Sequence, residues 1–233
     1  MTIEERSDLM LSFAEGIPDD GGFQEWLPAL LSVIAGMVDV IGFFSLGIFA
    51  AHITGNMVEI SALVVHHNRV SPADILAIPV FVLAVAATWL IAKATGRRGR
   101  GLMRLLLLIQ FLLIVCVFIF SVITKPSVDP EGPAATIAAM IAVTSMACQY
   151  ALLRLTLRVA PSTAVMTGNL TNAVLALVDS SSRKSSSQQL RDALQLLIGF
   201  FVGCVAAAAA EMYLGEWDWS LPAALAGVAV ALS

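Results

Sequence analysis

Hydrophobic residues follow one another along most of this chain in long stretches, separated by short polar connections. Six of the stretches reach or approach the roughly 20 residues with which a helix crosses the hydrocarbon core of a bilayer. They cover residues 27–49, 75–92, 102–123, 134–153, 194–210 and 221–232, of which the last is the shortest. The pattern predicts an all-α fold, a polytopic membrane helix bundle.

Two further apolar segments are too short for a comfortable crossing, and both open with the tripeptide Thr-Gly-Asn. They cover residues 54–65 and 167–178. Each follows one long segment and precedes two others, so the order span, short helix, span, span occurs twice. The sequence therefore predicts two related halves within one membrane domain, residues 27–124 and 134–233.

The distribution of charge between the connections predicts how the two halves are oriented. Lys and Arg surround the loop at residues 93–104 and flank the second short helix, whereas the loops at 129–131 and 211–218 are acidic. Under the positive-inside rule the basic loops are cytoplasmic, so the second short helix enters and leaves from the cytoplasm and the first from outside. We therefore expect about six spans, two re-entrant half-helices, an inverted two-fold repeat and both termini in the cytoplasm.

The alternative is eight full spans in a parallel repeat. It would place Arg183 and Lys184 outside and the acidic loop at Glu216 inside, which is against the same rule. The charge pattern favours the inverted arrangement.

Composition agrees with a lipid environment and excludes several other classes of protein. Of the 233 residues, 58% are hydrophobic and 13% are charged, which no ordinary water-soluble domain approaches. Residues 1–26 form an acidic tail that lacks the basic-then-apolar order of a cleaved signal peptide, and we expect it in the cytosol. The basic residues cluster near helix ends, so nucleic acid is not an expected partner. Cys116, Cys148 and Cys204 lie in apolar segments without metal-ligand spacing, so no disulfide framework, metal or cofactor is expected.

Four motifs of this chain occur together, in the same order, in a known family. They are Gly-x-x-Asp at Gly36–Asp39, Phe-Ser-Leu-Gly at Phe44–Gly47, His-x-Thr-Gly-Asn at His52–Asn56 and Met-Thr-Gly-Asn at Met166–Asn169. From about Leu27 to the C-terminus the chain resembles the YoaK-like family of bacterial inner-membrane proteins. The resemblance implies an integral inner-membrane protein and no particular substrate, because the function of the family is unknown. Members usually carry Gln-Asn where this chain has Gln149-Tyr150, so no role of that Asn is carried over.

A short helix that begins inside the membrane leaves its first backbone N–H groups to be paired by protein, water or a ligand. Thr and Asn cap such ends, and Gly permits close approach. Two of these ends meeting near the midplane would form a site for an anion or a polar molecule. The residues predicted to form it are Thr54, Gly55, Asn56, Thr167, Gly168, Asn169, Asp39 and Gln149. The alternative is that each tripeptide only caps and packs its helix.

The role of each of three titratable residues near the first tripeptide has two interpretations. Asp39 lies deep in the first span, where a carboxylate is costly unless it is paired, protonated or wet. It either couples transport to a proton or cation, or accepts hydrogen bonds from the amides of a Thr-Gly-Asn helix. His52 is a secondary candidate for relaying protons, although a lone histidine at the start of a helix is more often a hydrogen-bonded cap. Glu59, the other secondary candidate, can face the site or extend outward.

The leading hypothesis is a transporter or channel for a small polar or anionic solute, with the lipid bilayer and that solute or ion as partners. One alternative is a membrane sensor or scaffold that acts through its acidic tail. A membrane-embedded enzyme is less favoured, because the sequence has no HExxH, GxSxG or suitably spaced carboxylate pair. Gly199-x-x-x-Gly203 is a close-packing face that joins either the two halves or two subunits of a homo-oligomer.

Overall fold

The computed structural model describes residues 23–65, 70–157, 163, 166–178 and 183–233. This part of the chain forms eight α-helices and two short 3₁₀ helices, without a strand. The all-α class predicted from the sequence is confirmed. The predicted acidic tail lies outside the described residues up to residue 22.

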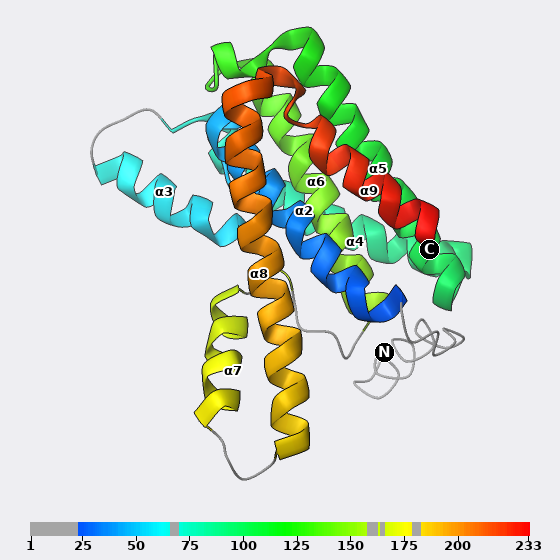
Figure 1. Ribbon diagram of the computed structural model, residues 1–233. Helices are drawn as coiled ribbons and strands as arrows, with labels where there is room; N and C mark the ends of the chain where they lie inside the picture. The colour runs from blue at the N-terminus through cyan, green and yellow to red at the C-terminus, as the bar shows by residue number, and fades with distance from the viewer. Residues whose placement is uncertain (1–22, 66–69, 158–162, 164–165, 179–182) are drawn as a thin grey trace.

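Figure 1 labels the α-helices in chain order. They are α2 (Phe23–Leu46), α3 (Ile53–Val65), α4 (Pro72–Thr95), α5 (Gly99–Thr124), α6 (Pro133–Thr156), α7 (Met166–Val178), α8 (Arg183–Leu214) and α9 (Ser220–Leu232). The 3₁₀ helices η1 (Pro126–Val128) and η2 (Gly215–Trp217) lie in the turns before α6 and α9. The two short helices therefore begin one residue before the predicted positions.

Five of the described helices are long and apolar enough to cross a membrane, namely α2, α4, α5, α6 and α8. The chain is thus a multi-pass membrane protein. The sixth predicted span, α9, has 13 residues and is about 20 Å long, less than the roughly 30 Å of a hydrocarbon core. It is as short as α3 and α7, which also have 13 residues each.

Local signals in the sequence fix the ends of α4. Ser71 caps its N-terminus, since the Ser71 hydroxyl accepts from the N–H of Asp74 and the Asp74 carboxylate accepts from the N–H of Ser71. Pro72 follows at the first helical position, where no backbone donor is needed. Gly96 ends the helix with a φ of 60°, a left-handed conformation that glycine adopts at no steric cost.

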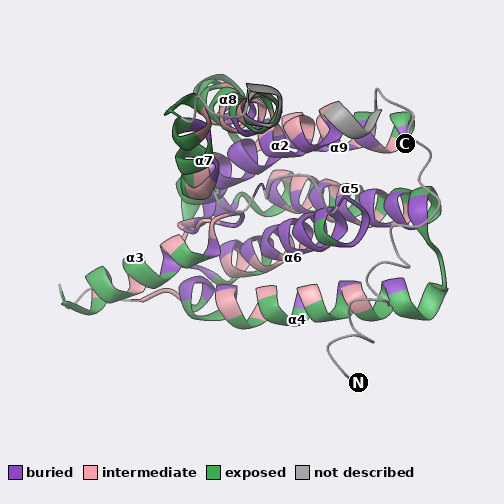
Figure 2. Cartoon of the chain, turned by 90° about the horizontal axis from the view of Figure 1, so that it is seen from below, coloured by how far each residue is buried: buried purple, intermediate pink, exposed green. Residues whose placement is uncertain are grey.

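The helices lie in layers (Figure 2). α4 forms one outer face, α5 and α6 follow, then α2 and α9, and α8 with α7 forms the other outer face. In their most apolar segments 67% of α2 and 72% of α6 is buried, against 22% of α4 and 33% of α8. The core of the bundle is therefore the pair α2 and α6, and the outer helices present apolar side chains to lipid.

The direction and packing of the helices follow one scheme. α2, α5 and α8 run toward the end of the bundle that is uppermost in Figure 1, and α4, α6 and α9 run away from it. α3 connects α2 to α4 on the upper side, and α7 connects α6 to α8 on the lower side. Several of the packing contacts match in pairs. α2 packs against α8, and α4 packs against α6 in the same way. Likewise α5 packs against α6 and α9 against α2, and α3 packs against α4 and α7 against α8.

Glycines allow α2 and α8 to cross with their backbones in contact. A Cβ on Gly203 would lie 2.1 Å from the carbonyl oxygen of Val33, and one on Gly36 would lie 2.3 Å from that of Phe200. Gly199 also faces α2, with 2.9 Å between its would-be Cβ and the nearest carbonyl oxygen. The predicted close-packing face therefore joins the two halves of one chain. The alternative of a homo-oligomer contact through Gly199 and Gly203 is wrong, because α2 occupies this face.

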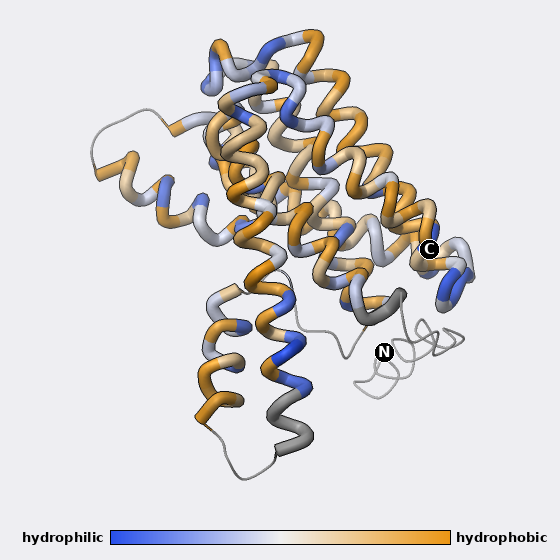
Figure 3. Tube along the Cα trace, in the orientation of Figure 1, coloured by the Kyte–Doolittle hydropathy of each residue, from blue (hydrophilic) through white to orange (hydrophobic). Residues whose placement is uncertain are grey.

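Polar residues gather in the turns at both ends of the bundle (Figure 3). At the upper end Ser127 donates a hydrogen bond to the Glu216 carboxylate, which brings the acidic turn at residues 129–131 beside the one in η2. The basic turn between α4 and α5, with Arg97 and Arg98, lies at the opposite end. The acidic turns and this basic turn thus lie at opposite ends of the bundle.

Candidate functional site

The connection between α2 and α3 folds back along the end of α2. Gly47 takes a left-handed conformation with a φ of 71° and ends the helix. The N–H of Ile48 then donates to the carbonyl oxygen of Gly42 at 3.3 Å. As a result the start of α3 lies beside Asp39, about two turns before the end of α2.

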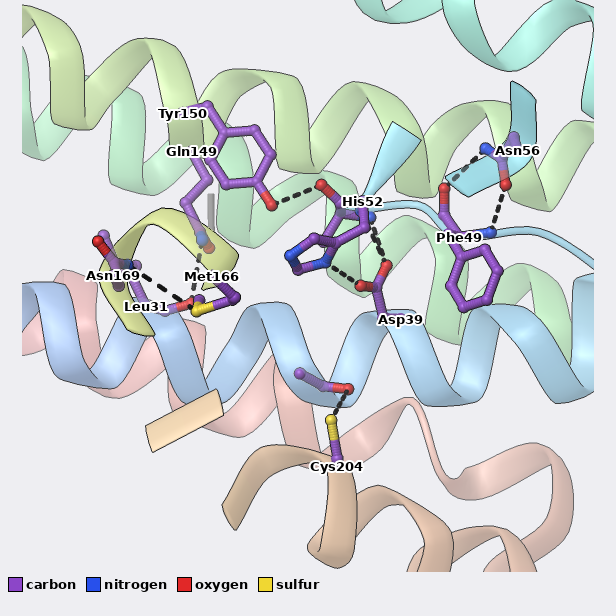
Figure 4. A network of polar contacts seen from close by, with 12 residues as sticks. Leu31, Asp39, Phe49, His52, Asn56, Gln149, Tyr150, Met166, Asn169 and Cys204 are labelled. Atoms are coloured by element: carbon purple, nitrogen blue, oxygen red, sulfur yellow. Dashed lines mark hydrogen bonds and ion pairs between the residues drawn. The ribbon is translucent and has the colours of Figure 1, made fainter. Parts of the chain in front are cut away.

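Asp39 is the centre of a buried polar cluster, with only 4% of its surface exposed. Its Oδ1 accepts from the backbone N–H of Ala51 at 2.7 Å and from that of His52 at 3.2 Å. Its Oδ2 is paired with Nδ1 of the His52 imidazole. Three groups at the start of α3 therefore converge on one carboxylate, as Figure 4 shows.

The contacts of Asp39 match the second interpretation given above, in which its carboxylate accepts hydrogen bonds from backbone amides at the start of a short helix. The carboxylate comes from a different helix and pairs amides just before the first residue of α3, so it acts as a cap. A negative charge at a helix N-terminus is favourable, because it complements the positive end of the helix dipole. An anionic solute approaching α3 would therefore meet a carboxylate that already occupies this position.

Asn56 holds the connection together. Its side-chain oxygen accepts from the N–H of Phe49 at 2.8 Å, and its amide nitrogen donates to the carbonyl oxygen of Phe49 at 2.9 Å. Gly55 leaves room for the Phe49 ring, whose nearest atom would lie 3.0 Å from a Cβ at this position. Gly168, its counterpart in α7, is partly buried. In the first tripeptide Gly55 therefore accommodates the ring of Phe49, and Asn56 pairs with its backbone.

The two tripeptides present their residues in the same way. Thr54 and Thr167 are exposed, whereas Asn56 and Asn169 are buried. The amide nitrogen of Asn169 lies 4.0 Å from the sulfur of Met166, and this is not its only contact. The structure therefore places the two Asn of the predicted site inside and the two Thr outside.

Gln149 lies in the core of the bundle and is fully buried. Its side-chain oxygen accepts from the amide of Gln110 on α5 at 2.6 Å, and its nitrogen donates to the carbonyl oxygen of Leu31 on α2 at 3.0 Å. Both ends of the amide are used to join α2, α5 and α6. Gln110, which the sequence analysis did not single out, belongs to this link.

Tyr150 is a further residue that the sequence analysis missed as a member of the cluster. Its hydroxyl donates to the carbonyl oxygen of Ala51 at 2.7 Å, on the residue whose N–H is paired with Asp39. A phenol inside an apolar helix needs a hydrogen-bond partner, which is the signal that could have identified it.

Glu59 is not brought together with Asp39 or His52. It lies on α3 one turn past Asn56, is partly buried, and has Asp74 at the start of α4 as its electrostatic neighbour. Its side chain therefore faces another acidic residue, on the side of α3 that packs against α4.

The polar cluster lies between the beginnings of the two short helices. Figure 4 draws Asn56 of α3 on one side of His52, and Met166 and Asn169 of α7 on the other, all along α2. Figures 1 and 2 agree in placing the starts of α3 and α7 near each other. Asp39, His52 and Tyr150 thus occupy the region where the sequence predicted that two helix ends meet.

Comparison with known families identifies the class of protein. A family described as protein of unknown function (DUF1275) has a model that matches residues 27–232. The chain belongs to the DUF1275 family. The resemblance to YoaK-like membrane proteins, expected from about Leu27 to the C-terminus, is confirmed over these residues. No curated protein and no solved structure matches this DUF1275 chain.

Proposed function

We propose that this DUF1275 protein is a transporter or channel for a small polar solute, which binds near the middle of the membrane where α3 and α7 begin. The observation that carries the proposal is the cluster of Asp39, His52 and Tyr150, which lies inside a largely apolar bundle next to both short helices. Ionisable groups inside a membrane bundle are costly, and they commonly mark the paths of solutes and ions.

An inverted repeat is the proposed framework of the site. In chain order α2, α3, α4 and α5 correspond to α6, α7, α8 and α9, and the long helices of each pair run in opposite directions in Figure 1. α2 and α6 both have 24 residues, and α3 and α7 both have 13. In transporters of this design the broken helices hold the substrate at the repeat interface, and the halves rock around it. Two pairs are unequal, α4 and α8 with 24 and 32 residues and α5 and α9 with 26 and 13.

The proposed orientation places the basic end of the bundle in the cytoplasm, as expected for a protein of the bacterial inner membrane. The first residues of α2 and the last of α9 lie at the same end as the turn between α4 and α5 (Figure 1). Both termini would then be cytoplasmic. The acidic turns that Ser127 and Glu216 connect would lie outside.

Cysteine labelling tests the orientation. On a background without native cysteines, single cysteines replace Asn68 after α3 and Ser181 after α7, and a membrane-impermeant maleimide is applied from each side. We expect Asn68→Cys to react only from outside and Ser181→Cys only from inside. Reaction of both from the same side would contradict the inverted repeat and remove the shared site.

Uptake by proteoliposomes tests transport. Purified protein in vesicles is incubated with a small-molecule extract of bacterial cells, and the vesicle contents are determined by mass spectrometry. We expect at least one polar solute to be enriched over protein-free vesicles, and Asn169→Leu to lower the enrichment roughly 10-fold, equivalent to about 1.4 kcal/mol. Thr167→Ala, at the exposed position of the same tripeptide, is the control. If no solute distinguishes the two kinds of vesicle, the protein is not a transporter of these solutes, and a sensor or scaffold becomes the better interpretation.

A further inference from the structure

His52 uses only one of its two ring nitrogens in contacts with the described residues. Nδ1 is paired with Asp39, whereas Nε2 is buried and has no hydrogen-bond partner among the described residues. About a quarter of the side chain, 26%, is exposed, and the edge of the ring faces Phe200 of α8 with 5.0 Å between the ring centroids. Buried polar atoms in native proteins are nearly always paired, so this nitrogen calls for a water or a ligand.

The contact with Asp39 decides what kind of partner Nε2 accepts. An ionised carboxylate can only accept hydrogen bonds, so Nδ1 must carry the proton in the Asp39 contact. In a neutral imidazole the other nitrogen then has a lone pair and no proton. Asp39 therefore fixes the tautomer in which Nε2 is an acceptor.

The surroundings of Nε2 favour a donor and disfavour an anion. The Asp39 carboxylate lies against the same imidazole, where it is in contact with Nδ1. The Tyr150 hydroxyl already donates its hydrogen bond to the carbonyl oxygen of Ala51. The described residues of α7, Met166–Val178, carry no charged side chain. An anion would thus meet a carboxylate and a lone pair, whereas an N–H or O–H group would pair with the lone pair.

We propose that Nε2 of His52 is a solute-binding atom that accepts a hydrogen bond from an N–H or O–H group of a neutral or cationic solute. Asp39 is the positioning residue that holds the imidazole in the accepting tautomer. The inference rests on the proposed site between α3 and α7 and narrows its substrate class, because it removes anions from the polar solutes that the site takes.

Nitrogen NMR of His52 tests the first half of the inference. The full chain with His66→Gln and His67→Gln is labelled with ¹⁵N-histidine and placed in lipid nanodiscs, so that His52 gives the only histidine signal. At mildly alkaline pH we expect the proton on Nδ1. In Asp39→Asn the side-chain oxygen can still pair with the two backbone amides, but its NH₂ group would donate to Nδ1, and the proton should move to Nε2. A proton on Nε2 in the unsubstituted protein would overturn the proposal.

Two small probes of opposite hydrogen-bonding character test the second half. Methylammonium offers only donors and formate only acceptors, and each is added at constant ionic strength adjusted with sodium chloride. We expect methylammonium to shift the Nε2 signal of Asp39-containing protein in a saturable way and formate to leave it unchanged. In Asp39→Asn the preference should reverse. A saturable shift with formate, or no shift with methylammonium, overturns the proposal even if Asp39→Asn fails to fold.

This experiment is separable from the test of transport, because it measures binding without movement across the membrane. If Nε2 binds methylammonium and proteoliposomes take up no solute, the His52 assignment stands and the transport proposal fails. If solutes are taken up and Nε2 shifts with neither probe, transport stands and the assignment of His52 fails.

Discussion

Asn56 pairs with both backbone polar groups of Phe49, accepting from its N–H at 2.8 Å and donating to its carbonyl oxygen at 2.9 Å. These are the two bonds that a neighbouring β-strand would make with Phe49. The pair lies at an irregular stretch of backbone inside a membrane protein, where unpaired backbone groups are costly. A side chain thus replaces the helix hydrogen bonds that the connection lacks.

Replacing Asn56 by Ala should destabilise the protein strongly. Asn56 is fully buried, and both backbone groups of the partly buried Phe49 would lose their partner, at a cost of up to about 1–3 kcal/mol each. The free energy of unfolding, measured by steric trapping in bicelles, is the readout. Thr54→Ala changes an exposed residue of the same tripeptide and should cost far less. Equal effects of the two substitutions would contradict the role assigned to Asn56.

Replacing Gly203 by Ala should force α2 and α8 apart. The new methyl group would lie 2.1 Å from the carbonyl oxygen of Val33, and overpacking of this kind costs about 1–3 kcal/mol or more. Gly101→Ala on α5 is the matched control, because no atom lies within 4 Å of its would-be Cβ. It should stabilise the protein by about 0.5–1 kcal/mol, as alanine does in a helix. Thermal unfolding in detergent distinguishes the two, and a Gly203→Ala protein as stable as Gly101→Ala would disprove the close crossing.

The pair of Gln110 and Gln149 should behave as a unit. Gln149→Leu leaves the Gln110 amide without its acceptor in a buried position, which costs about 1–3 kcal/mol. In the double variant with Gln110→Leu both amides are replaced by apolar groups of similar size, so stability should return toward that of the natural protein. A double-mutant cycle of unfolding free energies measures this. A double variant less stable than Gln149→Leu alone would contradict the prediction.

Stability should fall as pH rises because of Asp218, which lies between η2 and α9. Burial raises the pKa of Asp218 from the ordinary 3.8 to about 9, and the neighbouring carboxyl groups of Glu211 and Glu216 act in the same direction. Between these values the folded protein retains a proton that the unfolded chain has lost. This contribution to stability is therefore fully present below pH 3.8 and is lost progressively up to about pH 9.

Asp218→Asn removes this titration and keeps an oxygen that can accept from the N–H of Trp219, as Asp218 does at 2.6 Å. Between about pH 5 and pH 8.5 the Tm of the natural protein should fall by a few degrees more than that of Asp218→Asn. Glu131→Gln, an exposed acid in the neighbouring turn, is the control and should keep the natural slope. Parallel slopes for the natural protein and Asp218→Asn would show that Asp218 is not protonated in the folded state.

The helices could be predicted from the sequence because their signals are local. Apolar length and the tripeptides fixed α3 and α7 to within one residue, and the order of long and short segments was found as expected from α2 to α8. The end of α2 was placed at residue 49, although Gly47 stops it at Leu46 with a left-handed turn. The length of α9 was the weak point, since an apolar stretch of 12 residues leaves little room for a span.

The candidate site was predicted in part. Asp39 pairs with Ala51 and His52, just before the first tripeptide, and the His52 ring is its closest partner. Helix periodicity alone would have separated Thr54 from Asn56, because residues two apart point to nearly opposite faces. Gln149 was predicted to bind the solute, whereas its side chain pairs with Gln110 on α5 and Leu31 on α2. These partners depend on how three helices pack, which no local pattern reveals. The role of Tyr150 depends on the same packing.

Asp39 and the three donors that it pairs with belong to different segments, so the attachment of α3 to α2 is electrostatic as well as steric. Drawing the start of α3 away from α2 would break all three contacts together and leave a bare carboxylate in hydrocarbon, at a cost of several kcal/mol. Because all three contacts end on one carboxylate, they are made or lost together, and the position of the start of α3 against α2 depends on the Asp39 side chain.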